Sequence, residues 1–163
     1  MNENSPTIHY LFTLLEGAWI GEGRGGYPSI NSFDYREMLS FTRRDEKSLA
    51  YEQRTQKHVE GQTGYVISHW ENGFIRVLEG GELEMVNVQS GGRGEVLVGT
   101  IETNGDAIRI RFVSKTIMND PRMVSSARTF ELESGTLRYE MEMQTTQTNQ
   151  LSQHLKIVLK RVK

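Results

Sequence analysis

The chain has 163 residues, of which 36% are hydrophobic and 25% are charged, a length and composition typical of one folded domain. Its 19 basic and 21 acidic side chains give a formal charge of -2 and form no basic block, which argues against nucleic acid as a partner. It contains no cysteine, which excludes disulfides, thiolate nucleophiles and sulfur-rich metal sites, so any metal must be held by histidine or oxygen ligands.

The chain shows no sign of a membrane or secretory segment. No apolar run reaches the roughly 18–20 residues that cross a bilayer, and the polar start lacks the charged and apolar regions of a signal peptide. We therefore expect no membrane partner and a cytoplasmic location. We expect residues 1–8 to be a flexible N-terminus and residues 9–163 to form a single domain.

A short helix is predicted near the N-terminus. Ser5-Pro6 is typical of an N-cap followed by proline in the first helical turn. Leu11, Leu14 and Leu15 then have the spacing i, i+3, i+4, which gives the helix one apolar face. The pattern ends before a glycine.

The rest of the chain is punctuated by turn dipeptides. Asn-Gly and Gly-Gly supply the positive φ angles that tight hairpin turns require. The dipeptides at which we expect hairpins are Asn72-Gly73, Gly80-Gly81, Gly91-Gly92, Asn104-Gly105 and Ser134-Gly135.

Between the turns, apolar residues alternate with polar ones, which is the period of a β-strand. The groups expected to share a strand face are Phe33, Tyr35, Leu39 and Phe41; Leu49, Tyr51, Gln53 and Thr55; Tyr65, Ile67 and His69; Ile108, Ile110 and Phe112; and Leu137, Tyr139, Met141 and Met143. About ten strands joined by short turns predict an all-β protein, an antiparallel up-and-down β-barrel (calycin-like) with a short N-terminal helix. Closure removes exposed sheet edges, and a barrel of this size can hold one small ligand inside.

One glycine-rich stretch has two interpretations. Residues 21–26 have the GxGxxG spacing of a dinucleotide-binding loop, but Pro28 and a strand pattern follow where that loop needs a helix. We therefore expect these glycines to permit close backbone approach near the first strand. Trp19, just before them, is expected to plug one end of the core.

The same stretch also begins a more specific pattern. Residues 17–23 read GxWxGxG and are followed by Tyr27-Pro28-Ser29-Ile30. Further matching segments are Phe33-Asp34-Tyr35, Tyr51-Glu52-Gln53-Arg54-Thr55, Gly73-Phe74-Ile75-Arg76, Val88-Gln89-Ser90-Gly91, Arg128-Thr129-Phe130, Met143-Gln144-Thr145-Thr146 and His154-Leu155. From about Tyr10 onward the chain resembles the nitrobindin family, which are haem-binding β-barrels related in fold to lipocalins and fatty-acid-binding proteins.

The resemblance implies one haem b per chain, with His154 as the axial ligand of the iron. The four histidines of the chain, His9, His58, His69 and His154, have no metal-binding spacing of their own. Strand parity does not select His154 either, because it groups with Val158 and Val162 while Leu155, Ile157 and Leu159 form the opposite face. The family pattern alone makes this assignment.

The resemblance also implies which residues line the pocket. His69, Gln89 and Met143 match positions around the distal side of the haem, where His69 would line the pocket without binding iron. A partly exposed strand histidine is the other interpretation of His69, and ordinary core filling is the other interpretation of Met143. Ser29 stands where the family usually has threonine and keeps the hydroxyl, and Arg122 stands near a position often occupied by lysine and keeps a cation that could pair with a haem propionate. An exposed, solvated arginine in a loop at the barrel mouth is the other interpretation of Arg122.

The implied function is binding of nitric oxide and isomerisation of peroxynitrite to nitrate at a ferric haem. Two alternatives remain at this point: a carrier of a small apolar ligand such as a fatty acid, and a haem-based nitric oxide sensor without turnover.

Overall fold

The computed structural model describes residues 5–58 and 61–163. Its first element is helix α1 (Ser5–Leu15), so the helix includes residues 5–8 of the predicted flexible N-terminus. The prediction for residues 1–4 lies outside the described residues. No helix in the described ranges is long and apolar enough to cross a membrane.

Ten strands follow the helix. They are β1 (Gly17–Tyr27), β2 (Ile30–Asp45), β3 (Ser48–His58), β4 (Tyr65–Val77), β5 (Leu83–Gln89), β6 (Gly94–Asn104), β7 (Ala107–Met118), β8 (Met123–Glu133), β9 (Thr136–Thr145) and β10 (Ser152–Arg161). Each strand pairs antiparallel with the next, and β1 pairs with β10 to close the barrel. The predicted fold class is confirmed.

Four of the five predicted hairpin dipeptides lie at turns, and one prediction is wrong. Ser134 and Gly135 connect β8 and β9 with φ angles of 49° and 71°, as a primed turn requires. Asn72-Gly73, however, lies in the middle of β4. A Cβ on Gly73 would come within 2.7 Å of the Tyr51 ring and 2.2 Å of the Val86 carbonyl oxygen, so glycine there serves close packing between strands.

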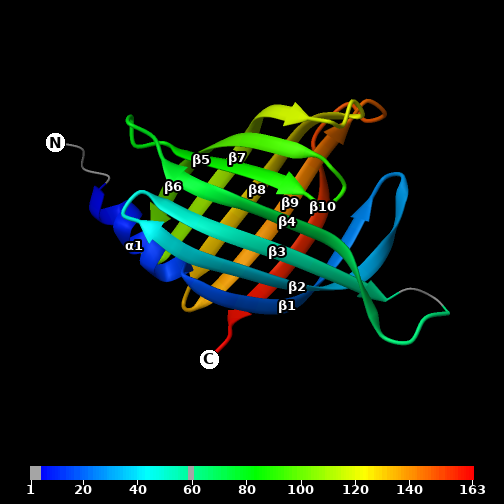
Figure 1. The fold of residues 1–163 in the computed structure, drawn as a ribbon, viewed down its shortest axis with the longest axis horizontal. Helices are drawn as coiled ribbons and strands as arrows, with labels where there is room; N and C mark the ends of the chain where they lie inside the picture. The colour runs from blue at the N-terminus through cyan, green and yellow to red at the C-terminus, as the bar shows by residue number, and fades with distance from the viewer. Residues whose placement is uncertain (1–4, 59–60) are drawn as a thin grey trace.

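The two ends of the barrel differ. Helix α1 lies across one end, next to the C-terminus (Figure 1), and buries Leu11, Phe12 and Leu15 in the main core. Trp19 is 1% exposed and donates its indole N–H to the Leu15 carbonyl at 2.8 Å, which confirms that it plugs this end. The loops at the opposite end surround the cavity described below.

The glycines of residues 21–26 also behave as expected. Strand β1 continues through them to the β1–β2 turn, with no helix following. A Cβ on Gly25 would lie 2.4 Å from the Phe33 ring and 3.0 Å from Leu155, and one on Gly23 would lie 2.7 Å from Ile157. Bare backbone in β1 therefore lets large side chains of its neighbours close over it.

Among the register shifts between neighbouring strands, two β-bulges change which histidines face the interior. In β4, Ser68 is the extra residue between His69, which pairs with Thr55, and Ile67, which pairs with Gln56. The prediction that Tyr65, Ile67 and His69 share a face is therefore wrong: Tyr65 and Ile67 are exposed, whereas His69 is partly buried. In β10, His154 is the extra residue between Gln153 and Leu155.

Candidate functional site

A cavity of about 700 Å³ is lined by residues 30–33 at the start of β2 and by Lys57 and His58 at the end of β3. These strand ends lie at the end of the barrel opposite α1 (Figure 1). This volume lies within the usual range of small-molecule and cofactor sites. Its lining includes His154 and Leu155 from β10, and Ser68 and His69 from β4. Both bulges thus bring two consecutive side chains to the cavity, which regular alternation does not allow.

The surroundings of His154 fix its tautomer and its protonation state. Its Nδ1 atom lies 3.0 Å from the Gly26 carbonyl oxygen, and because a carbonyl can only accept, Nδ1 carries the proton. Burial lowers the pKa of His154, and the charges of Arg93 and His69 lower it further against the effect of the Gly26 carbonyl. The imidazole is therefore neutral, and its Nε2 atom keeps an unshared electron pair.

Two aromatic rings orient the His154 ring. The Tyr27 and Phe33 rings meet it edge-on, with centroids 6.1 and 6.3 Å away. The Tyr27 hydroxyl is itself anchored, because it donates to the Met143 carbonyl at 3.1 Å. A histidine with one nitrogen donated to a backbone carbonyl and the other free is the arrangement typical of a metal ligand.

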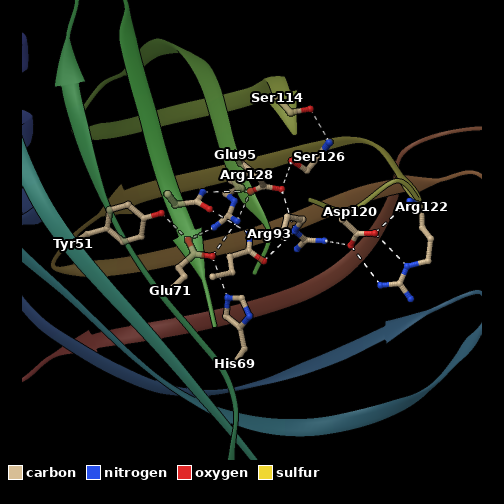
Figure 2. A network of polar contacts seen from close by, with 12 residues as sticks. Tyr51, His69, Glu71, Arg93, Glu95, Ser114, Asp120, Arg122, Ser126 and Arg128 are labelled. Carbon is tan, nitrogen blue, oxygen red and sulfur yellow. Dashed lines mark hydrogen bonds and ion pairs between the residues drawn. The ribbon is translucent and has the colours of Figure 1, made fainter. Parts of the chain in front are cut away.

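His69 belongs to a different chemical environment. Its Nε2 atom lies 3.0 Å from Glu71 Oε2, so the ring nitrogen donates to the carboxylate. Glu71 also accepts from the Tyr51 hydroxyl at 2.6 Å and from Arg128 at 2.5 and 3.1 Å. Figure 2 shows His69 below Glu71, and Tyr51 and Arg128 on the other sides of the carboxylate.

The buried charges around Arg128 are matched. Arg128 is 1% exposed and bridges Glu71 and Glu95, with a distance of 2.6 Å from Nη2 to Glu95 Oε2. Burial alone would raise the pKa of Glu71, but the Arg128 charge and hydrogen bonds from His69 and Arg128 outweigh it and lower that pKa to about 2. Burial likewise acts to raise the pKa of Glu95, and the charges of Arg128 and Arg93 lower it.

Arg93 connects this interior network to the mouth of the barrel. It lies between β5 and β6, donates to Gln89 Oε1 at 3.0 Å, and lies 3.6 Å from both Glu95 and Asp120. Asp120 in turn accepts from the exposed Arg122 at 3.2 Å. The chain of polar contacts therefore runs from the interior to the loop between β7 and β8 (Figure 2).

A second pocket of about 330 Å³ lies beside the main cavity. Ser29, Arg122 and Met143 line it, and Arg93 and Ile30 line both. Gln89 lines neither of these pockets; it is buried and holds Arg93. The structure therefore brings His154 and His69 together in the main cavity, places Ser29, Arg122 and Met143 next to it, and places Gln89 behind Arg93.

Sequence reasoning missed the charged residues of this site. Glu71, Glu95 and Arg128 lie at inward positions of strands whose next inward residues are Ile75, Leu97 and Phe130. Their parity was available as a signal, but a charged residue at an inward position reads as a break in the pattern. Only the partners on other strands show that these charges are matched.

Comparisons with known proteins agree with this picture. Residues 10–161 match a family model described as a THAP4-like, heme-binding beta-barrel domain. A protein of Arabidopsis thaliana named peroxynitrite isomerase Rv2717c is 36% identical, over 95% of this chain and 91% of that protein. A Mycobacterium leprae protein named peroxynitrite isomerase is 32% identical, over 96% of this chain and 95% of its own length.

A solved structure is similar over nearly the whole chain. The crystal structure of Rv2717c from M. tuberculosis superposes with a TM-score of 0.84 at 28% sequence identity. The match covers 96% of this chain and 98% of the other. The similarity extends over the barrel as a whole, including the strands that carry both cavity histidines.

Proposed function

The chain belongs to the THAP4-like haem-binding β-barrel family, the nitrobindin family of the sequence analysis, and on this premise we propose that it binds one haem b in the main cavity with His154 as the axial ligand. We further propose that the haem-loaded protein isomerises peroxynitrite to nitrate and binds nitric oxide at a ferric iron. The observation that carries the proposal is the neutral His154 imidazole, with Nδ1 donated to Gly26 and Nε2 without a hydrogen-bond partner among the described residues.

The cavity residues fit a haem in chemistry as well as in size. Phe33, Met141 and Leu155 supply apolar lining for a macrocycle, and Arg93 and Lys57 supply cations for its acidic groups. The neighbouring pocket adds Arg122 and the Ser29 hydroxyl. Among the described residues, no three His, Asp or Glu side chains cluster as a metal site of their own, so a metal held by one histidine within a cofactor is the arrangement that this donor set supports.

Haem held by His154 would supply an iron able to bind a small molecule. The chain's own residues orient the His154 ring and provide positive charge in the cavity. Gly26, Tyr27 and Phe33 hold the His154 ring in place. Arg93 provides a positive charge in the lining that attracts an anion such as peroxynitrite.

His69 would act on the substrate side of the cavity. Glu71 is ionised and accepts the Nε2–H of His69, so in the neutral ring the second nitrogen, Nδ1, is an acceptor. The contact with Glu71 thus fixes the orientation of the His69 ring and leaves its Nδ1 atom as a hydrogen-bond acceptor.

The deep interior around Arg128 disfavours the headgroup of a carried fatty acid, although Arg93 and Lys57 in the cavity lining are cations available to a carboxylate. A carboxylate headgroup inside a barrel needs a cation that is not already neutralised. The buried Arg128 is bridged by both Glu71 and Glu95, and a third carboxyl group, Glu37, is buried nearby. An anionic headgroup at this depth would meet a surplus of carboxyl groups.

The first experiment is a haemin titration followed by absorption spectroscopy. The wild-type protein is expected to give a Soret band, and His154→Ala is expected to abolish or strongly alter it. His69→Ala is the matched control, because it removes a histidine from the opposite wall and should keep the iron spectrum of a His154-ligated haem. A band lost in the His69 variant but kept in the His154 variant would show that His154 is not the ligand.

Turnover is tested separately. Stopped-flow decay of peroxynitrite, with nitrate measured as product, is expected to be faster with the haem-loaded protein than in buffer. Decay at the rate of buffer, with haem bound, would reject the isomerase and leave a nitric oxide sensor or carrier.

A further inference from the structure

One buried carboxyl group has no role in the network around Arg128. Glu37 lies in β2 at an inward position between Tyr35 and Leu39, and it is only 3% exposed. Its neighbours on the adjacent strands are Gly21 of β1 and Thr55 of β3. Glu37 therefore projects into the barrel at mid-height, where the strand alternation calls for an apolar side chain.

The Glu37 carboxyl lacks the partners that an ionised buried group needs. Both of its oxygens are buried without a hydrogen-bond partner among the described residues, and the same is true of the Tyr35 hydroxyl on the same strand face. An unpaired carboxylate inside a protein is strongly unfavourable, whereas the neutral acid is tolerated. The geometry thus favours the protonated form.

The groups that face Glu37 reinforce this preference. Glu71 on β4 is negative, Tyr35 on β2 and Tyr139 on β9 are neutral, and Arg128 on β8 is the nearby cation. Strand β1 contributes Gly21 and Gly23, strand β3 contributes the Gln53 amide and Thr55, and strand β10 contributes Ile157 and Leu159. Because Arg128 is already matched by Glu71 and Glu95, an ionised Glu37 would be a surplus negative charge.

Burial and the charges around Glu37 place its pKa within a pH range that experiments on the protein can cover. Burial raises the pKa of Glu37 to about 8, with the charge of Glu71 adding to the rise and Gln53 and Arg128 opposing it. Glu37 also lies directly behind the cavity, since its neighbours Tyr35, Gln53, Thr55 and Glu71 all line that cavity. A charge on Glu37 and a charge in the cavity must therefore influence each other.

We propose that Glu37 couples anion binding in the cavity to proton binding at alkaline pH: there its carboxyl group takes up one proton from solvent when an anion enters and releases it when the anion leaves. The proposal deepens the proposed function, on which it rests for the place of the anion. In this proposal Glu37 acts on the bound anion through its charge alone, since no contact between Glu37 and the ligand is required.

The direction in which anion affinity changes with pH follows from the protonation state of Glu37. Well below pH 8, Glu37 is already protonated, so anion affinity does not change with its titration. Above about pH 8 it is ionised in the free protein, so when an anion enters, either Glu37 takes up a proton or its negative charge repels the anion. Across a partly screened interior, one such charge is expected to weaken anion binding about tenfold.

The decisive experiment uses infrared difference spectroscopy, which sees the protonated carboxyl directly. In the haem-free protein, the carbonyl-stretch band of a carboxylic acid is expected at about pH 6.5 and is expected to disappear by about pH 9.5. Glu37→Gln is expected to lack this band, and Glu22→Gln, which changes an exposed glutamate on neighbouring β1, is expected to keep it. Labelling with ¹³C-glutamate in the wild type assigns the band to a glutamate even if the variant fails to fold.

The coupling is then measured with azide on the haem-loaded protein. Adding azide at about pH 8.5 is expected to increase the carboxylic acid band in the wild type and in Glu22→Gln, and the azide affinity of Glu37→Gln is expected to lose the extra fall of about tenfold at alkaline pH. Hydroxide is also an anion, so its competition with azide is determined separately for each protein from the pH dependence of the absorption spectrum without azide, and the azide affinities are corrected for it.

The outcomes separate the two proposals. An absent or pH-independent acid band, or the same azide profile in wild type and Glu37→Gln, would overturn the coupling while a Soret band leaves haem binding intact. Failure to bind haemin would overturn the proposed function and, with it, the anion site on which the coupling depends.

Discussion

At the scale of single residues, the interior of this barrel depends on matching buried charges. Arg128 is fully buried and is tolerable only because Glu71 and Glu95 both bridge it. Glu71 also accepts hydrogen bonds from Tyr51 and His69. Removing its charge would leave Arg128 with Glu95 as its one carboxylate partner among the described residues and His69 without a charged acceptor.

The prediction at this scale is that Glu71→Gln destabilises the fold by about 3–5 kcal/mol at neutral pH, because it breaks a buried ion pair. The folded pKa of Glu71 is lowered from 4.5 to about 2, so its contribution is complete above about pH 4.5 and is lost as the pH falls through 2. Urea unfolding as a function of pH should therefore show the difference between wild type and variant shrinking toward pH 2.

The control for this prediction is Glu131→Gln. Glu131 pairs with Arg138 on the surface, with side chains 37% and 44% exposed, and such pairs contribute about 0–1 kcal/mol. Equal losses in the two variants would mean that burial of the Glu71 pair has no energetic significance.

At the scale of elements, the two β-bulges build the cavity wall. A regular strand presents every second side chain to the interior, so it could offer His154 or Leu155 but not both. The extra residue in β10 places both along the cavity, and the extra residue in β4 does the same for Ser68 and His69. The bulges explain why strand parity could not select His154.

The prediction at this scale is that deleting Gln153 removes the bulge in β10. His154 would then pair with Glu142 in a regular ladder and take the outward place that Gln153 now holds, because Leu155 and Ile157 remain inward. The variant is expected to keep the strand content of the wild type in circular dichroism but to lose its Soret band with haemin.

The matched control is deletion of Asn149, which shortens the nearby loop between β9 and β10 without touching the ladder. It should retain haemin binding. A Soret band of unchanged position and strength in the Gln153 deletion would show that the bulge is not what places the ligand.

At the scale of the whole molecule, stability and ligand binding lie at opposite ends of the barrel. Helix α1 closes one end with Leu11, Phe12 and Leu15, and Arg161 of β10 donates to the carbonyls of Leu14 and Glu16 to fasten the helix to the last strand. The cavity and its loops occupy the other end. Changes at the helix end should therefore affect folding without affecting the site.

The prediction is that Phe12→Ala destabilises the protein by about 3–5 kcal/mol, because Phe12 is fully buried and its removal leaves a cavity in the core. Haemin affinity of the folded variant should stay within about twofold of the wild type. Tyr10→Ala, on the exposed side of the same helix, should change stability by less than about 0.5 kcal/mol. Urea unfolding and haemin titration of the three proteins check both statements, and a large loss of haemin affinity in Phe12→Ala would contradict the separation of the two ends.

The sequence by itself determined the architecture. The Ser5-Pro6 cap and the leucine spacing after it predicted the helix, and period-two alternation with turn dipeptides predicted about ten antiparallel strands and closure. The resemblance led to the family. The turn dipeptides failed at Asn72-Gly73, where a glycine that permits close packing against Tyr51 looks the same as a turn glycine.

Only the tertiary structure decided the interior of the site. The alternation of Phe33, Tyr35, Leu39 and Phe41 passed over position 37, and the acid at that position lies inside the barrel. Whether a buried charge is matched, or a bulge turns His154 toward a cavity, depends on residues from strands far apart in sequence. Local patterns reveal how a strand alternates, but electrostatic balance and register are properties of the closed barrel, because they arise only when all ten strands are in place.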